Sequence, residues 1–338
     1  MCTAIVYSAG GDHYFGRNLD LEYSYDETVT ITPRNHPICF RRAKTLHQHY
    51  ALIGMAYVTD GYPLYYEAIN EKGVGMAGLN FPGNAYYKPE EDGCDNITPF
   101  EFIPWVLGQC ADISEAKELL KRINLVNIAF SDKLPLSPLH WMVCDKDSSI
   151  VVEQTVEGLK VYDDPVGVLT NNPTFDYHLF NLNNYMQLSI DPPQNSFSNK
   201  LELNTYSRGM GAMGLPGDLS SVSRFVKAAF TKLNSVSGAA ELESISQFFK
   251  ILGSVEQQRG CVRLGESYEY TLYSCCCNLE RGVYYFTTYE NSQISAVDMF
   301  AEDLEGSAPI SYELPVKQNI RFLNKWLCHN KWLIFDEK

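Results

Sequence analysis

The sequence predicts an α+β protein in which antiparallel β-sheets lie between layers of helices. Short β-type runs begin at the N-terminus and return in several groups, and many are too closely spaced to leave room for the helix of a βαβ unit. Two blocks of helical sequence separate these groups, and one of them carries a clear apolar stripe. The order of strands, helices, strands, helices and strands is typical of layered, mainly antiparallel sheets.

The first two predicted strands form a hairpin at the start of the chain. Residues 3–7 and 13–15 are β-type runs, and the glycine-containing stretch 8–12 between them predicts a turn. The same criteria predict further strands over residues 29–32, 51–58, 73–79, 140–144, 150–154, 159–162 and 166–170. Two later strands, 268–277 and 283–289, are joined by a second hairpin at 278–282. Residues 65–71 are predicted to be helical.

The helical blocks cover residues 100–108 with 114–123, and 222–233 with 240–252. In the first block, Ser114 is the expected N-cap. In the second block, apolar residues at positions 222, 225, 226, 229, 230 and 233 follow the helical repeat and predict a buried face. Arg224 lies off this stripe.

The length and composition of the chain predict a single domain that spans residues 1–338. Residues 319–338 are expected to be a C-terminal extension that packs on the core or forms an oligomer contact. The net charge of −14 and the absence of a basic run argue against a nucleic-acid or anionic-membrane partner. The ten cysteines lack paired CxxC spacing, and the N-terminus has no secretory signal pattern. No apolar stretch reaches 18 residues. We therefore expect a cytoplasmic protein without stable membrane association.

Cys2 is the first candidate for chemistry. Removal of Met1 would place a thiol and a free α-amino group on one residue. An α-amino group titrates near ~8 and a free thiol near ~8.5, so the amine can take the thiol proton and later pass it to a leaving group. The predicted hairpin brings Arg17 and Asp20 close to this residue. A guanidinium there can stabilise a thiolate, and a carboxylate can hold the new α-ammonium.

Two stretches, 73–78 and 209–214, match the glycine spacing of dinucleotide-binding loops. Neither has the strand before it and the helix directly after it that such a loop requires, so a nucleotide site is not expected.

Five motifs stand in a fixed order: residues 2–4 (Cys-Thr-Ala), 15–20 (Phe-Gly-Arg-Asn-Leu-Asp), 78–82 (Gly-Leu-Asn-Phe-Pro), 169–173 (Leu-Thr-Asn-Asn-Pro), and 215–218 (Leu-Pro-Gly-Asp) with 223–225 (Ser-Arg-Phe). With these motifs the chain resembles the choloylglycine hydrolase family of conjugated bile acid hydrolases (bile salt hydrolases) and penicillin V acylases. The resemblance covers nearly the whole chain. It implies the N-terminal-nucleophile (Ntn) hydrolase fold, a four-layer αββα sandwich, usually assembled as a homotetramer and working without a cofactor.

The resemblance also implies roles for the motif residues. Cys2 would be the nucleophile, with Arg17 and Asp20 beside it. Asn80 would donate its amide to the oxyanion, Asn171 would position the α-amino group and the substrate amide, and Arg224 would complete the polar network. Asn at position 80 tilts the expectation towards bile salt hydrolases, because several penicillin V acylases carry Tyr there.

The expected reaction is hydrolysis of the amide in glycine- and taurine-conjugated bile salts. A steroid needs a broad apolar wall, and we expect these side chains to supply it: Tyr23, Tyr25, Tyr57, Tyr62, Phe81, Leu134 and Leu139. By analogy with the family, residues 207–209 are expected near the amino-acid end of the substrate. Two alternatives stay open, a penicillin V acylase with the same chemistry and a non-catalytic protein that binds bile acids or lipids.

Overall fold

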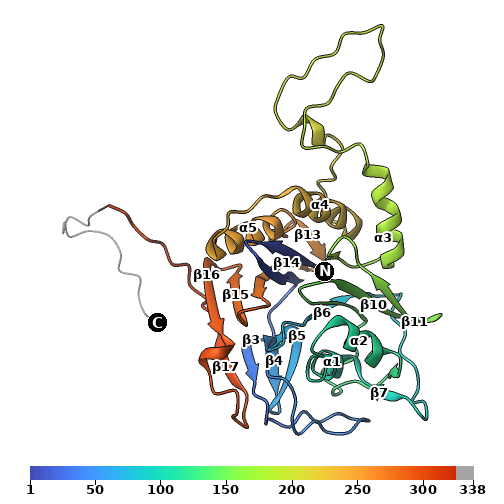
Figure 1. Ribbon diagram of the computed structural model, residues 1–338, viewed down its shortest axis with the longest axis vertical. Coiled ribbons are helices and arrows are strands. Elements are labelled where there is room, and N and C mark those ends of the chain that lie inside the picture. The colour runs from blue at the N-terminus through green and yellow to red at the C-terminus, as the bar shows by residue number, and fades with distance from the viewer. Residues whose placement is uncertain (325–338) are drawn as a thin grey trace.

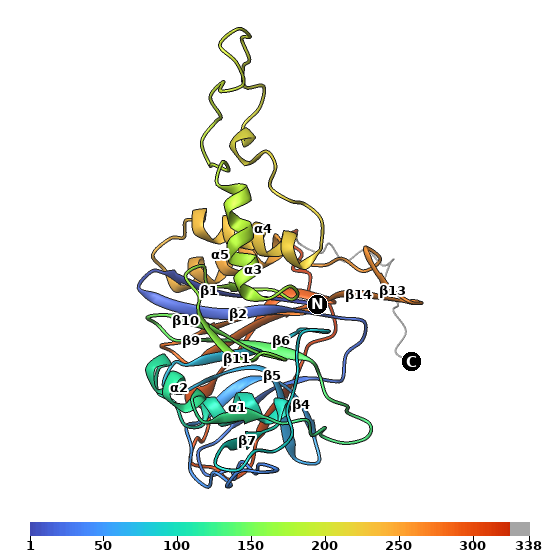
Figure 2. The ribbon, with the colours of Figure 1, turned by 90° about the vertical axis from the view of Figure 1, so that its right-hand side faces the viewer.

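A computed structural model describes residues 1–324 and shows a four-layer arrangement (Figures 1 and 2). Two β-sheets lie face to face in the middle. Helices α4 (Ser221–Asn234) and α5 (Glu241–Gly253) cover the outer face of one sheet, and α1 (Phe102–Leu107) and α2 (Ile113–Leu120) cover the other (Figure 2). This arrangement confirms the predicted αββα sandwich with mainly antiparallel sheets.

The first sheet carries the N-terminus of the chain. Its strands run in the order β12 (Val168–Leu169), β1 (Cys2–Ala9), β2 (Asp12–Leu21), β14 (Ser267–Asn278), β15 (Val283–Thr288) and β16 (Asn291–Asp298), with β13 (Val262–Leu264) paired to β14. All neighbours in it are antiparallel. Gly16 permits the close approach of β2 and β14, because a Cβ there would lie 2.0 Å from the carbonyl oxygen of Cys275.

The second sheet is antiparallel throughout and is built mostly from the first half of the chain. Its strands run in the order β11 (Gly158–Asp163), β10 (Ser149–Thr155), β9 (Leu139–Cys144), β6 (Gly75–Asn80), β5 (Tyr62–Asn70), β4 (Leu52–Thr59), β3 (Thr28–Thr32) and β17 (Ile310–Glu313). A small parallel pair, β7 (Asp95–Ile97) and β8 (Ile123–Leu125), lies beside the outer helices. The main hydrophobic core is formed by side chains of the two large sheets together with those of α4 and α5 that face the first sheet.

Two predictions of local secondary structure are wrong, and the predicted buried face of α4 does not extend to Leu233, which is exposed. Residues 65–71 are not a helix, because the segment 62–70 is strand β5, hydrogen-bonded between β4 and β6. Its first six side chains alternate between half-buried and buried positions, as a strand between two layers requires. The N-cap of α2 is Asp112 rather than Ser114, because the Asp112 carboxylate accepts the backbone N–H of Glu115 at 2.8 Å.

A long segment between α3 (Phe175–Asn181) and α4, which the sequence did not predict as a separate feature, projects far from the four layers (Figures 1 and 2). We call residues 183–213 the projecting arm. It exposes the apolar side chains of Met186, Ile190, Phe197 and Tyr206. Within residues 1–324, four short 3₁₀ turns complete the secondary structure: Pro99–Glu101, Leu182–Tyr185, Met210–Ala212 and Met299–Ala301.

The predicted C-terminal extension lies partly outside the described residues. Residues 319–324 are exposed and belong to no helix or strand, and residues 325–338 are not described. Within residues 1–324, no helix is long and apolar enough to cross a membrane.

Candidate active site

Cys2 lies at the first position of β1, where the hairpin register places it opposite Leu19 of β2. Its side chain is only 3% exposed and lines a cavity of about 420 Å³ between the two sheets. Arg17 and Asn80 line the same cavity. The nucleophile predicted from the sequence therefore faces a space that can hold a substrate.

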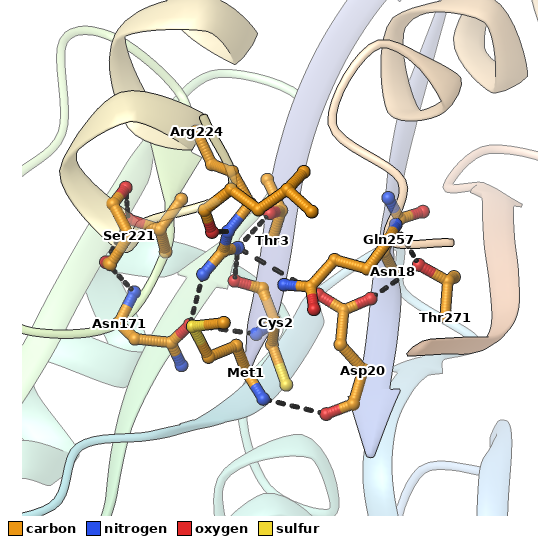
Figure 3. A network of polar contacts seen from close by, with 12 residues as sticks. Met1, Cys2, Thr3, Asn18, Asp20, Asn171, Ser221, Arg224, Gln257 and Thr271 are labelled. Atoms are coloured by element: carbon orange, nitrogen blue, oxygen red, sulfur yellow. Dashed lines mark hydrogen bonds and ion pairs between the residues drawn. The ribbon is translucent and has the colours of Figure 1, made fainter. Parts of the chain in front are cut away.

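The backbone nitrogen of Cys2 is held by the side chain of Asn171 (Figure 3). It donates to Asn171 Oδ1 at 2.8 Å. Arg224, from α4, donates to the same Oδ1 at 2.7 Å and to the carbonyl oxygen of Cys2 at 2.6 Å. It lies off the apolar stripe of α4, as predicted, yet it is buried because it points at the start of β1. The nitrogen that would become the α-amino group thus already has a fixed acceptor.

Asp20 lies in β2 beside Cys2 and is completely buried. Its Oδ1 accepts the hydroxyl of Thr271 at 2.6 Å, and its Oδ2 lies 4.0 Å from Arg224 Nη1. Burial raises the pKa of Asp20, whereas the charges of Arg224 and of the N-terminal ammonium oppose that rise. Within residues 1–324, Asp20 Oδ2 has no hydrogen-bond donor. This oxygen can therefore accept a hydrogen bond from an ammonium group at Cys2.

Arg17 extends from β2 into the space between the sheets. Its Nη1 donates to the carbonyl oxygens of Gly78 at 2.7 Å and Tyr66 at 3.2 Å. Burial alone would lower the pKa of this guanidinium, but interaction with the acidic side chains around it, Cys2 first and Glu67 among them, raises the pKa overall. Arg17 therefore carries its positive charge beside the cavity that Cys2 also lines.

Asn80 ends strand β6 and is the expected oxyanion donor. Its carbonyl oxygen accepts Asn171 Nδ2 at 2.7 Å, which ties the two asparagines together. No group within residues 1–324 hydrogen-bonds to its side-chain amide, and the residue lines the cavity. That amide can therefore donate to an oxygen that develops charge near Cys2.

Met1 occupies the space in front of Cys2 (Figure 3). Its ammonium group donates to the carbonyl oxygen of Asp20 at 2.8 Å and pairs with Glu269 Oε1 at 2.7 Å. The N–H of Asp20 donates back to the Met1 carbonyl oxygen at 3.0 Å. While Met1 is present, the nitrogen of Cys2 belongs to a peptide bond and has no basicity.

Several residues that the sequence did not single out support this site. Ser221 Oγ accepts the N–H of Asn171 at 2.8 Å, and His178 Nε2 contacts the carbonyl oxygen of Asn171 at 2.9 Å. Glu67 lies behind Arg17, and Glu269 pairs with Met1. Isolated residues of common types carry no spacing signal, and only the packing of strands and helices from distant parts of the chain brings them to the site.

The cavity has the apolar wall that a large hydrophobic ligand requires. The rings of Tyr23 and Tyr25 lie 4.9 Å apart, and those of Tyr25 and Tyr57 lie 5.9 Å apart. Leu134 and Leu139 line the cavity from another loop and from β9.

Two of the predicted wall residues and the predicted polar segment do not line the cavity. Tyr62 packs behind the wall, against Phe100 and Phe130. Phe81 follows the end of β6 and turns into the core, where it stacks on His140 at 4.2 Å. Residues 207–209 lie on the projecting arm and make no part of this lining.

The chain matches known proteins over most of its length. The family model described as linear amide C–N hydrolases, choloylglycine hydrolase family, matches residues 2–312. A bile salt hydrolase/transferase of Lactiplantibacillus plantarum is 60% identical over 315 residues, which is 93% of this chain and 97% of that protein. Another from Clostridium perfringens is 40% identical over 330 residues, 96% of this chain and all of that protein.

Comparison with solved structures finds proteins of the same kind. The crystal structure of a mutant conjugated bile acid hydrolase from Clostridium perfringens superposes with a TM-score of 0.89 at 40% identity, over 96% of this chain and 100% of that one. A penicillin V acylase from Agrobacterium tumefaciens superposes with a TM-score of 0.72 at 20% identity, over 92% and 91% of the two chains. The second likeness concerns the fold alone.

Proposed function

Because the chain belongs to the choloylglycine hydrolase family of linear amide C–N hydrolases, we propose that it hydrolyses the amide bond of glycine- and taurine-conjugated bile salts. The observation that carries this proposal is the nitrogen of Cys2, held 2.8 Å from Asn171 Oδ1 at the edge of an apolar cavity. The names of the 60% and 40% identical relatives support the substrate class.

The proposed reaction begins after Met1 has been removed. The nitrogen of Cys2 is then an α-amine that keeps Asn171 as its acceptor, and it takes the proton of the Cys2 thiol. The thiolate attacks the amide carbon, and the amide of Asn80 donates to the oxyanion. The α-ammonium gives its proton to the departing nitrogen as the C–N bond breaks. This step releases glycine or taurine and leaves the bile acid as a thioester on Cys2.

Water completes the cycle. The same α-amine takes a proton from the water molecule, whose oxygen attacks the thioester carbon, and the C–S bond breaks. The products are the free bile acid and a regenerated thiol. Arg17 favours the thiolate in both half-reactions, while Asp20 and Arg224 balance the charge around the amine. The chain's own residues supply every proton transfer in this scheme.

The site residues fall into two groups with different proposed roles. We assign catalysis to Cys2, Arg17, Asp20, Asn80, Asn171 and Arg224. We assign steroid binding to the wall formed by Tyr23, Tyr25, Tyr57, Leu134 and Leu139, because these aromatic and aliphatic side chains suit a large apolar ring system. Tyr62 supports the cavity wall from behind through Phe100 and Phe130, whereas Phe81 is part of the core.

Turnover of three substrates tests the proposal. Purified, processed protein is incubated with glycocholate, taurocholate and penicillin V, and the released amine or phenoxyacetic acid is quantified. We expect the conjugated bile salts to be the better substrates. Faster turnover of penicillin V would instead favour the acylase alternative. Binding of bile salts without release of any product would favour the non-catalytic alternative.

A transfer reaction is a second candidate, supported by the word transferase in the names of both relatives. In the proposed scheme, an added amine would attack the thioester in place of water and form a new amide. Formation of a new bile acid amide from glycocholate and a labelled amino acid, measured by mass spectrometry, tests this candidate. Exclusive formation of free bile acid would reject it.

We also propose that the single domain assembles as a homotetramer in the cytoplasm. The exposed apolar side chains of the projecting arm support an assembly contact. The nine cysteines within the described residues are all free, which suits a reducing compartment. Light scattering on the intact protein tests the assembly, and a monomer mass at micromolar concentration would contradict it. Fractionation of the producing cells tests the location.

A further inference from the structure

Glu67 is a fully buried carboxylate directly behind the candidate active site. It belongs to β5 and is 0% exposed. It does not line the cavity, so it cannot touch a substrate there. A carboxylate in such a position costs free energy unless charges and hydrogen bonds compensate for the lost water.

The compensation comes from the opposite sheet and from Arg17. The hydroxyl of Tyr273 donates to Glu67 Oε2 at 2.8 Å, and the hydroxyl of Tyr284 donates to Oε1 at 2.6 Å. Arg17 Nη1 lies 3.7 Å from Oε2. Both oxygens accept hydrogen bonds, which is the arrangement expected of an ionised carboxylate. Burial raises the pKa of Glu67, and Arg17 followed by the two phenols offsets part of that rise.

Arg17 connects this carboxylate to Cys2. The same Nη1 donates to the carbonyl oxygen of Tyr66, the residue before Glu67, so the guanidinium is fixed to β5 at two neighbouring residues. Arg17 also lines the cavity together with Cys2. The guanidinium therefore pairs with Glu67 on one side and lines the same cavity as Cys2 on the other. Its positive charge acts on both acidic groups.

We propose that Glu67 is a positioning residue for the reaction of Cys2. Glu67 fixes the Arg17 guanidinium and partly neutralises its positive charge, and in this way it sets the pH range in which Cys2 becomes a thiolate. This inference rests on the proposed role of Cys2 as nucleophile but not on the identity of the substrate. Within residues 1–324, the other titratable and charged groups that face the set are Tyr66 on β5, Cys275, Cys277, Tyr273 and Glu269 on β14, Tyr284 on β15, Asp20 on β2 and Arg224 on α4.

Alkylation of Cys2 tests the proposal without any substrate. The rate of modification by iodoacetamide is measured from pH 5 to pH 9, and the N-terminal peptide is quantified by mass spectrometry to separate Cys2 from the other cysteines. Glu67→Gln keeps the shape of the side chain and removes its charge. A charge in direct contact shifts a pKa by roughly 1–3 units, and Glu67 acts on Cys2 through Arg17, so we take the lower end of that range, roughly one pH unit. We expect the midpoint of alkylation to move down by that amount.

Two further variants complete the experiment, the first as a control for the loss of a buried acid and the second as a milder test of Glu67 itself. Glu101→Gln removes another buried carboxylate, one that caps the turn before α1 and contacts neither Arg17 nor Cys2. It should lower the melting temperature without moving the alkylation midpoint. Tyr284→Phe leaves Glu67 in place but removes one hydrogen bond to its charged form, so it should move the midpoint down by a smaller amount.

An unchanged or upward-shifted midpoint in Glu67→Gln would overturn the proposal. If that variant does not fold, an unchanged midpoint in Tyr284→Phe would overturn it. In the turnover assay, the acidic limb of kcat/KM should shift in the same direction with KM unchanged. A shifted alkylation midpoint in a protein that hydrolyses no bile salt would reject the proposed substrate and leave the role of Glu67 intact.

Discussion

Replacing Asn171 by Ala should remove the acceptor that orients the catalytic amine while leaving the four layers intact. The side chain makes three hydrogen bonds. Its Oδ1 accepts the nitrogen of Cys2 at 2.8 Å and Arg224 Nη2 at 2.7 Å, and its Nδ2 donates to the carbonyl oxygen of Asn80 at 2.7 Å. All three join groups that the proposed mechanism uses.

The size of the effect follows from these contacts. A neutral hydrogen bond contributes about 1 kcal/mol and a charge-assisted one about 2 kcal/mol, so the three together represent about 4 kcal/mol. At 1.36 kcal/mol per tenfold change in rate, full loss in the transition state lowers kcat/KM by about 10³-fold. Arg224 keeps its bonds to the Cys2 carbonyl oxygen and to Thr3, so the fold should survive.

The assay is release of glycine from glycocholate by Asn171→Ala, together with its melting temperature. Asn172→Ala is the matched control, because that neighbouring side chain makes one hydrogen bond, to the carbonyl oxygen of Pro82 at 2.7 Å, outside the Cys2 network. We expect the control to stay within a few-fold of the unmodified protein. A folded Asn171→Ala protein that retains more than about a tenth of the activity would refute the orienting role, since the three contacts would then contribute only about 1.4 kcal/mol.

Three further predictions follow from the same site. Asn80→Ala should lower kcat by about 10²-fold with little change in KM, because one oxyanion donor is lost, and a purely KM effect in steady-state kinetics would contradict this role. Cys2→Ser should lose more activity than Asn80→Ala, because an amine with a pKa near ~8 deprotonates a hydroxyl far less readily than a thiol. Burial lowers the pKa of His178 to about 4, below its ordinary value near 6.5. The unfolded chain therefore binds more protons between these values, and the free energy of unfolding should fall by about 3 kcal/mol as the pH drops from 6.5 to 4. His178→Gln should lack this contribution in urea unfolding at pH 7 and pH 4.5, and equal pH dependence in the two proteins would show that His178 is not the source.

The sequence predicted the parts of the site that local geometry controls. Cys2, Arg17 and Asp20 come together in one hairpin, so a turn at 8–12 was sufficient to place them near each other. Asn80, Asn171 and Arg224 lie in three distant elements, and only the resemblance to a known family connected them. The pairing of β1 with β12 places Asn171 at the start of β1, and the packing of α4 places Arg224 there. Asn80 reaches the site from the opposite sheet, where β6 faces β1.

Other features depended on contacts that no local pattern encodes. The segment 65–71 contains residues that suit either a helix or a strand, and its pairing with β4 and β6 decides the outcome. Phe81 belongs to the third motif and Tyr62 precedes it in the chain, but the direction of each side chain depends on the strand that it follows or begins. Glu67 carries no motif, and its importance appears only when β5 faces β14 and β15 across the core.

The central claim is that Cys2 works as an N-terminal residue, with its own α-amine as the base. The most direct test compares two preparations of the chain, one with Met1 removed and one with Met1 retained, each identified by intact mass. Glycine release from glycocholate should occur with the processed form, and a mixture should be active in proportion to its processed fraction. Equal activity of the Met1-containing form, in which the nitrogen of Cys2 is a peptide nitrogen, would contradict the mechanism.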